Sequence, residues 1–176
     1  MTKPSSYYQP NSKSLSIAVL TVSDTRVEEN DTSGNYLVDA VLTAGHHCHE
    51  KLIVKDDIYQ IRAVCSRWIA DDSVQVILLT GGTGFSGRDS TPEAISPLFD
   101  KPVDGFGELF RTISFEEIGT STVQSRALAG IANNTLIAAM PGSTGACKTA
   151  WQNILSQQLD AHHKPCNFVS HLLVGV

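Results

Sequence analysis

Apolar residues along the chain form short continuous runs that alternate with segments of helical spacing. The runs over residues 15–22, 74–79 and 135–140 are typical of buried parallel strands, which are apolar on both faces. Residues 49–55 alternate apolar and charged side chains and predict a further strand. The pattern therefore predicts several strands separated by helical segments.

The helical segments carry recognisable start and stop signals. Helical spacing predicts helices over residues 36–44, 58–69, 106–117 and 150–159. Asp31 to Gly34 offers N-cap candidates for the first helix, and Gly45 follows at a position that favours a left-handed C-cap. Thr91 predicts an N-cap before Pro92 at the first position of another helix, which Pro97 should shorten.

This alternation predicts an α/β fold with three layers, in which a mostly parallel sheet has helices on both faces. Ligands of such folds bind at the carboxyl ends of the strands. We expect a flexible N-terminal tail over residues 1–14 and a single domain over residues 15–176. Residues from Pro165 onward show no clear period and are interpreted as a short docking tail.

Composition and charge narrow the class of protein. The 13 Lys and Arg against 18 Asp and Glu give a net charge of −5 without a basic run, so a nucleic-acid partner is not expected. The apolar runs are too short to cross a bilayer, and Met1 to Ser14 lacks the apolar segment of a secretory signal. We therefore expect a cytoplasmic protein without a membrane partner. Its scattered cysteines, which form no C-x-x-C pair, fit reduced thiols.

A glycine-rich loop follows the run at 74–79. Gly81, Gly82 and Gly84 leave successive backbone N–H groups unobstructed, as in loops that bind phosphate, and Thr83 lies between them. The loop is neither a Walker A motif nor a dinucleotide fingerprint. A tight turn between a strand and a helix would select the same glycines, so both interpretations remain open.

Two aspartates lie beside this loop in the predicted fold. A carboxylate at Asp89 would repel phosphate unless Mg²⁺ lay between them, and Asp56 at the end of another strand is a candidate second ligand. Alternatively, Asp56 or Asp57 is a helix N-cap and Asp89 is a loop residue paired with Arg88. The spacing alone supports both alternatives equally.

Three further segments carry candidate chemistry. Gly142 and Ser143 form a second loop after a strand, where the Ser143 hydroxyl could donate to a phosphate or a pterin edge. Beside Ser125, Arg126 could clamp phosphate or merely pair on the surface. The run His46 to His49 spans a helix end and a strand start, so its side chains should not converge on a metal ion.

Taken together, these motifs resemble the MoaB/Mog family of molybdenum cofactor proteins from about Leu15 to Phe168. The most specific matches are Thr80 to Gly84, Arg88 to Ala94, Gly105 to Glu108 and Pro141 to Ser143. Asp31 to Gly34 and Phe115 to Ser121 resemble the MoaB branch.

The resemblance implies a Mg²⁺-dependent transfer of AMP from ATP to the terminal phosphate of molybdopterin, with release of pyrophosphate. It places the catalytic carboxylates, which are also the magnesium ligands, on Asp56 and Asp89. Substrate or nucleotide contacts are expected at Gly81, Gly82, Thr83, Gly84, Arg88, Ser125, Gly142 and Ser143. A homo-oligomer, either a trimer or a hexamer, is also implied.

One departure from the family pattern keeps another class of protein open. Active members usually carry a proline before the first carboxylate, where this chain has Lys55. A non-catalytic protein that binds or carries molybdopterin would fit this change. The glycine loops alone would also permit a generic phosphate-binding or oligomeric scaffold domain.

Overall fold

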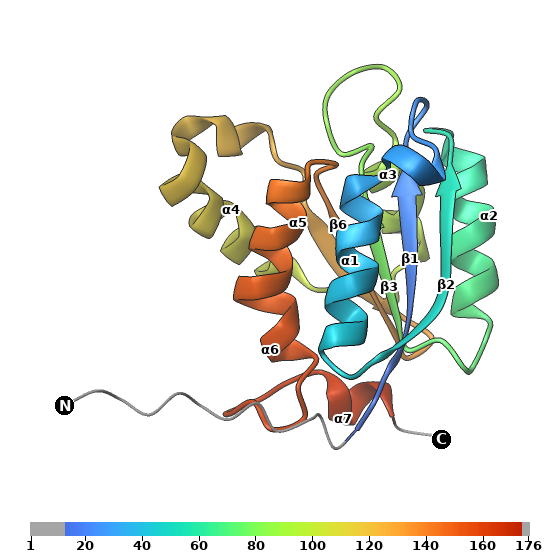
Figure 1. Cartoon of the computed structure of the whole chain (residues 1–176), viewed down its shortest axis with the longest axis vertical. Coiled ribbons are helices and arrows are strands. Elements are labelled where there is room, and N and C mark those ends of the chain that lie inside the picture. Colours follow the sequence, from blue (N-terminus) through green and yellow to red (C-terminus); the bar gives the residue numbers. More distant parts are fainter. Residues whose placement is uncertain (1–12, 174–176) are drawn as a thin grey trace.

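The computed structural model describes residues 13–173 (Figure 1). The strands are β1 (Ser16–Val22), β2 (His47–Val54), β3 (Val76–Thr80), β4 (Lys101–Pro102), β5 (Leu128–Ala132) and β6 (Thr135–Met140). The α-helices are α1 (Thr32–Thr43), α2 (Ile58–Ile69), α3 (Thr91–Ile95), α4 (Asp104–Ile118), α5 (Thr144–Ala150), α6 (Ser156–Gln158) and α7 (Val169–Leu172). Short 3₁₀ turns are η1 (Glu28–Asn30), η2 (Ser96–Leu98) and η3 (Gly119–Gln124), and the π-helical turn η4 (Trp151–Leu155) joins α5 to α6. Almost all of the expected flexible tail, residues 1–12, lies outside the described residues.

The strands form one mostly parallel sheet, which confirms the predicted fold class. Their order is β2-β1-β3-β6-β5-β4. The pairs from β2 to β6 are parallel, whereas β5 is antiparallel to β6 and β4 is antiparallel to β5. The antiparallel edge was not predicted, because β4 is very short and β5 contains mostly small residues. Asn133 and Asn134, at φ 46° and 62°, form the two-residue turn between β5 and β6.

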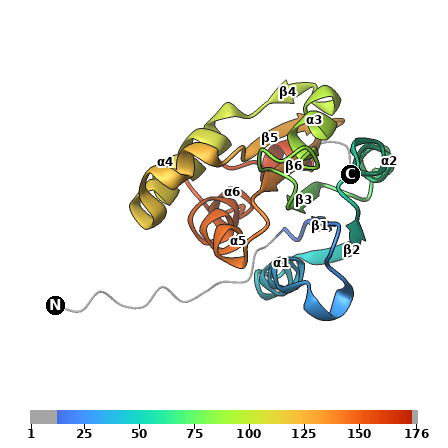
Figure 2. The same ribbon diagram turned by 90° about the horizontal axis from the view of Figure 1, so that it is seen from above.

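Helices cover both faces of the sheet (Figure 2). One face packs against α1, α4, α5 and η4, and the other packs against α2 and α3. Because side chains of a strand alternate between faces, Ile17 and Val19 of β1 enter the first core while Ala18 and Leu20 enter the second. None of the helices within residues 13–173 is long and apolar enough to cross a membrane.

The helix boundaries confirm several of the capping predictions and correct one. Asp31 caps α1 and Asp57 caps α2 through their carboxylates. α3 ends at Ile95, just before Pro97, as the proline predicts. However, Thr91 is the first residue of α3 and not its N-cap, because its hydroxyl donates to the Gly81 carbonyl at 2.9 Å.

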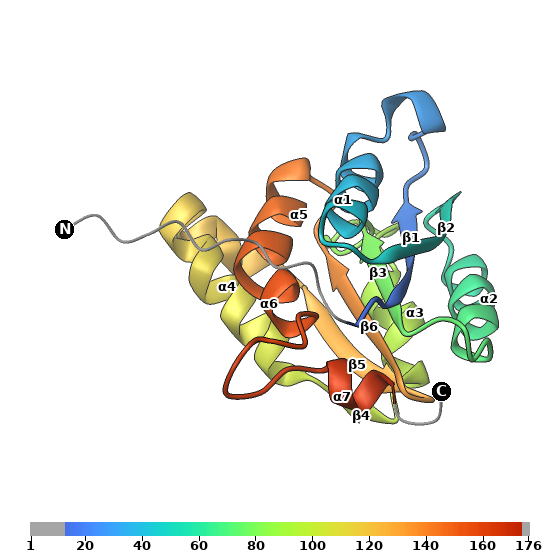
Figure 3. The same cartoon turned by 60° about the horizontal axis from the view of Figure 1, so that its bottom comes forward.

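The C-terminal segment docks against the end of the sheet opposite the glycine loop (Figures 1 and 3). Its short helix α7 buries Val169 and Leu172 in the core that contains α5 and η4. This packing confirms the interpretation of a docking tail after Pro165.

Candidate functional site

A pocket of about 470 Å³, with charged side chains in its wall, opens at the carboxyl ends of β1, β3 and β6. In Figure 1 the chain after β3 rises in a long loop above this end of the sheet. The residues that line this carboxyl-end pocket are Thr21, Val22, Ser23, Arg26, Asp31, Ser33, Thr80, Gly81, Gly82, Thr83, Gly84, Asp89, Ile118, Ser121, Gln124, Ser125, Pro141 and Gly142. Seven predicted site residues are therefore brought together here, namely Gly81, Gly82, Thr83, Gly84, Asp89, Ser125 and Gly142. Asp56, Arg88 and Ser143 lie nearby but do not line the pocket.

Glycine is required where the loop after β3 begins. Gly81 and Gly82 have φ values of +100° and +64°, which side chains disfavour. A Cβ on Gly81 would lie 2.2 Å from the Val22 carbonyl oxygen, and one on Gly142 would lie 3.2 Å from the Cα of Gly81. Val22 at the end of β1 therefore leaves no room for a side chain on Gly81, and the backbones of the two predicted loops lie close together at Gly81 and Gly142.

Asp56 joins the end of β2 to the glycine loop. Its Oδ1 accepts hydrogen bonds from the N–H and hydroxyl of Ser90, at 3.0 and 2.7 Å. A Cβ on Gly82 would lie 2.7 Å from its Oδ2, so this carboxylate lies directly behind the glycine. Asp56 is buried, and it does not cap α2, because the neighbouring Asp57 does so.

Asp89 places a second carboxylate on the other part of the loop. Its Oδ2 accepts the N–H of Ser86 at 2.7 Å and would lie 2.7 Å from a Cβ on Gly84. The hydroxyl of Ser86 lowers the pKa of this carboxyl, partial burial opposes the change, and the backbone N–H groups of Ser86 and Gly84 and the charge of Arg126 add to the lowering. Asp89 is therefore an anion at neutral pH, in the wall of the pocket.

Arg126 holds the loop from outside the pocket. Its guanidinium donates to the carbonyls of Thr83 and Asp89, both at 3.1 Å, and to that of Gly84. It also pairs with Glu93 at the start of α3. Two roles were left open for Arg126, binding of phosphate and formation of an ion pair. The structure shows the ion pair, and it also shows that Arg126 binds the backbone of the loop.

Arg88 pairs with Asp24 and not with Asp89. The alternative in which Asp89 is a loop residue paired with Arg88 is therefore wrong. The Nε and Nη2 of Arg88 donate to the two carboxylate oxygens of Asp24 at 2.9 and 2.7 Å. This bidentate bond lowers the pKa of the Asp24 carboxyl. The pair bridges the loop after β1 and the loop after β3 on the exposed rim.

Ser143 begins the helix that follows β6. Its Oγ accepts the N–H of Ala146 at 3.1 Å and caps α5. The preceding residue, Gly142, lines the pocket, and its carbonyl accepts the Ser33 hydroxyl at 2.7 Å. The structure therefore presents the backbone of this loop to the pocket, while the hydroxyl of Ser143 serves the helix.

The histidines of the run 46–49 point to separate places. The buried His46 accepts the N–H of Leu15 at Nδ1, whereas His49 lies 3.8 Å from Asp71. Within the part of the chain that the structure describes, no group of three or more His, Cys, Asp or Glu could hold a metal ion.

Sequence reasoning missed Asp31 as a residue of the pocket, because its capping role explained it fully. Asp31 is fully buried, accepts the hydroxyl of Thr21 at 2.8 Å and lies 3.1 Å from the ammonium of Lys51. It also missed the wall contributed by η3 and the end of α4. For Asp31 the sequence held one signal, which is Lys51 within β2. A charged side chain in a half-buried strand needs a partner of opposite charge, and Asp31 is one such partner.

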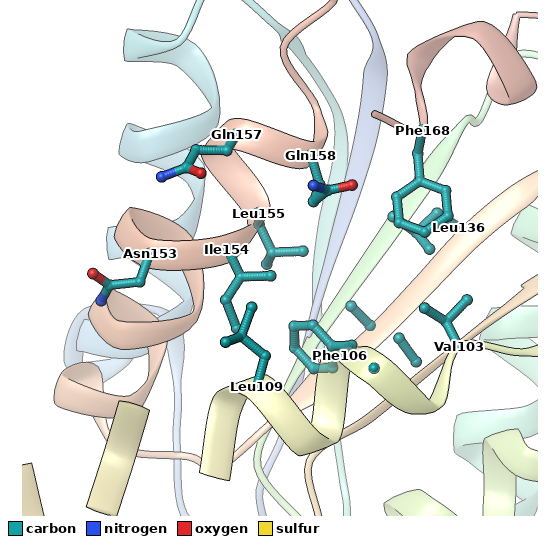
Figure 4. Close-up of a pocket in the computed structure, with 13 residues that line it drawn as sticks. Val103, Phe106, Leu109, Leu136, Asn153, Ile154, Leu155, Gln157, Gln158 and Phe168 are labelled. Carbon is teal, nitrogen blue, oxygen red and sulfur yellow. The ribbon is translucent and has the colours of Figure 1, made fainter. Parts of the chain in front are cut away.

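A second, apolar cavity of about 270 Å³ lies between α4, β5, β6 and the helical stretch η4–α6 (Figure 4). We call it the α4 cavity. It is lined by Val103, Gly105, Phe106, Leu109, Ala129, Leu136, Ala138, Asn153, Ile154, Leu155, Gln157, Gln158 and Phe168. No charged side chain of the described residues lines it, so a phosphorylated ligand would find no counter-charge there.

The chain has an α/β fold with a pocket at the carboxyl ends of its parallel strands, which is where ligands of such folds generally bind. The family model described as "Probable molybdopterin binding domain" matches residues 18–161. The chain belongs to this family.

Similar proteins place it among relatives from molybdenum cofactor synthesis. It is 64% identical over 156 residues to molybdenum cofactor biosynthesis protein B of Escherichia coli K12, covering 89% of this chain and 92% of the relative. The protein of the same name from Bacillus subtilis is 42% identical over 142 residues, covering 80% and 84%. Both chains match along most of their length.

Solved structures agree with this assignment. A crystal structure of molybdenum cofactor biosynthesis protein B superposes with a TM-score of 0.82 at 41% identity, covering 86% of this chain and 93% of the other. The tungsten cofactor synthesizing protein MoaB from Pyrococcus furiosus superposes with a TM-score of 0.75 at 38% identity, covering 82% and 92%.

Proposed function

We propose that the protein adenylates molybdopterin in the carboxyl-end pocket, transferring AMP from ATP to the terminal phosphate of molybdopterin. The observation that carries the proposal is the placement of Asp56 and Asp89. Their carboxylates adjoin Gly82 and Gly84 of one loop, although the two residues come from different strand ends. Membership of the molybdopterin-binding family supports the choice of substrate.

The two carboxylates suit a hard divalent cation. Mg²⁺ takes oxygen ligands and is commonly held by one or two carboxylates together with substrate phosphates. Asp56 and Asp89 supply that donor set, and both already accept hydrogen bonds that fix their orientation. When bound, the ion would neutralise charge on the phosphates of ATP.

The chain's own contribution is to bind and orient the two substrates. In the reaction, an oxygen of the molybdopterin phosphate forms a bond to the α-phosphorus of ATP, and the bond to the leaving pyrophosphate breaks. The glycine loop lets backbone N–H groups approach phosphate oxygens closely, and Gly142 offers a second backbone edge. Because phosphoryl-type transfers need little covalent help, positioning and charge neutralisation would supply most of the rate.

A second candidate function is binding of molybdopterin without catalysis. Asp56 favours it, because this carboxylate does not line the pocket and already accepts two hydrogen bonds from Ser90. The exposed Lys55 stands beside it, where active members of the family usually carry proline.

The test is pyrophosphate release from ATP, Mg²⁺ and purified molybdopterin by the wild type and by Asp56→Asn and Asp89→Asn. Asp57→Asn is the matched control, since asparagine also caps a helix and the residue adjoins Asp56. We expect turnover by the wild type and the control, and loss in the other two variants. If the wild type binds molybdopterin but releases no pyrophosphate, the proposed activity is refuted and the second candidate function, binding without catalysis, remains.

We also propose a homo-oligomer, either a trimer or a hexamer. Support comes from large apolar side chains that are exposed on α4 and η3, namely Leu109, Phe115, Ile118 and Val123. Light scattering of the wild type and of Phe115→Ser would test it. A wild type that is monomeric at micromolar concentration would refute the proposal.

A further inference from the structure

Three arginines lie around the glycine loop, and two of them have carboxylate partners. Arg88 makes its bidentate bond with Asp24, and Arg126 pairs with Glu93 while it donates to the loop carbonyls. Both guanidinium charges are therefore compensated by the protein itself. Neither residue lines the carboxyl-end pocket.

Arg26 differs from both in these respects. Among the described residues that line the carboxyl-end pocket, Arg26 alone carries a positive charge. Its Nη1 donates to the backbone carbonyl of Asn30, and within residues 13–173 it makes no ion pair. A guanidinium has five N–H donors, so this single bond leaves most of them available.

Two acidic residues near Arg26 in the chain, Glu28 and Asp31, are bound to Lys51 and not to Arg26. Asn30 precedes Asp31, whose carboxylate also lines the pocket, but Asp31 is already paired with Lys51 at 3.1 Å. Glu28 is bound to the same lysine at 2.7 Å. The guanidinium of Arg26 therefore has no carboxylate partner among residues 13–173.

The backbone holds Arg26 in place before any ligand binds. Its N–H donates to the hydroxyl of Ser23 at 3.1 Å, and Ser23 lies one residue beyond the end of β1. This bond fixes the backbone of Arg26, and the bond from Nη1 to the Asn30 carbonyl holds the half-buried side chain. Less conformational freedom is lost on binding when the group is already held in this way.

We propose that Arg26 binds phosphate oxygens of the ligand in the carboxyl-end pocket and selects phosphorylated ligands over their dephosphorylated forms. The inference rests on the proposed function, because it takes the pocket to be the substrate site. Arginine matches phosphate with two parallel hydrogen bonds, which neither glutamine nor a lysine ammonium reproduces. The phosphate could belong to molybdopterin or to ATP.

Calorimetric titration separates these two sources. Molybdopterin and Mg·ATP are titrated separately into the full-length wild type, Arg26→Gln and Arg26→Lys. Arg67→Gln is the matched control, because it removes the same charge from an exposed arginine of α2. For the ligand that Arg26 binds, we expect roughly a tenfold loss of affinity in Arg26→Gln, from one charge-assisted hydrogen-bonded contact, and a smaller loss in Arg26→Lys.

Each outcome separates this inference from the proposed function. If the wild type binds a ligand and Arg26→Gln binds it equally well, the assignment of Arg26 is overturned while the substrate site stands. If the wild type binds neither ligand, the proposed function fails and the role of Arg26 fails with it. Melting temperatures close to that of the wild type show that the variants are folded, and a steeper salt dependence in the wild type than in Arg26→Gln would support a charge contact.

Discussion

The two cavities of the molecule are built in opposite ways. The carboxyl-end pocket is walled by strand ends and glycine loops, so it presents backbone, a guanidinium and carboxylates to a ligand. The α4 cavity is walled by side chains of α4, η4 and the sheet, which are apolar apart from three amides. The α4 cavity therefore offers mainly apolar contacts, whereas the charged groups lie in the pocket where the strands end.

The largest expected effect concerns Asp89 in the carboxyl-end pocket. Asp89→Asn keeps the shape of the side chain but removes the charge, so AMP transfer should fall by roughly 10³-fold, as for other electrostatic groups in active sites. Pyrophosphate release measures it. Gln157→Ala, which alters an exposed residue of the α4 cavity, should leave the rate unchanged. A large loss of rate in Gln157→Ala would show that the α4 cavity also takes part in the reaction.

The converse change is made in the α4 cavity. Phe106→Ala removes a buried ring that lies 6.3 Å from the ring of Phe110, and it should lower the free energy of unfolding by about 3 kcal/mol. Urea denaturation measures this loss. The affinity of the folded variant for molybdopterin should match that of the wild type, and a marked decrease would show that the cavity takes part in binding.

A pair of glycine substitutions sharpens the same contrast. Gly82→Ala should cost about 2 kcal/mol of stability, because φ is positive there and the new Cβ would lie 2.4 Å from the Thr91 hydroxyl. Gly105→Ala, in the wall of the α4 cavity, meets no atom within 4 Å and should change stability by less than about 1 kcal/mol. Denaturation curves of both variants decide it, and equal losses would contradict the structural reason.

The smallest expected effect is a dependence of stability on pH. The pKa of Asp89 is lowered in the folded state, so its contribution to stability is fully present above the unfolded pKa, about 3.9, and is lost as the pH falls through the folded value. The difference in unfolding free energy between the wild type and Asp89→Asn should therefore be constant from about pH 5 to 7 and shrink below about pH 4. If this difference in unfolding free energy stays the same below about pH 4, the ionisation of Asp89 is not its cause.

Much of the carboxyl-end pocket could be predicted because its parts follow strand ends along the chain. The apolar runs identified β1, β3 and β6, and the glycines after β3 and β6 marked the two loops. Parallel strands in one sheet then bring those loops to one edge. The edge formed by β5 and β4 escaped notice, although the Asn133-Asn134 turn between two apolar segments was a usable hairpin signal.

The partners of the charged residues could not be predicted in the same way. Arg88 adjoins Asp89 in the chain but pairs with Asp24, and Asp31 joins Lys51 across β1 and β2. Sequence neighbours on a tight loop point in different directions, so adjacency says little about which charges meet. The α4 cavity was likewise invisible, since it depends on how side chains from α4 and η4 fail to fill the space between them.

Periodicity, turn chemistry and motifs are local properties of the chain, so the sequence alone was enough to predict β1, β2, β3 and β6, the helices that follow them, the glycine loops and the family. Only the tertiary structure decided that Arg126 supports the loop, that Asp56 lies behind Gly82 and that Arg26 keeps an uncompensated charge. These facts depend on distances between residues far apart in the chain, which are set by the packing of the whole sheet and its helices.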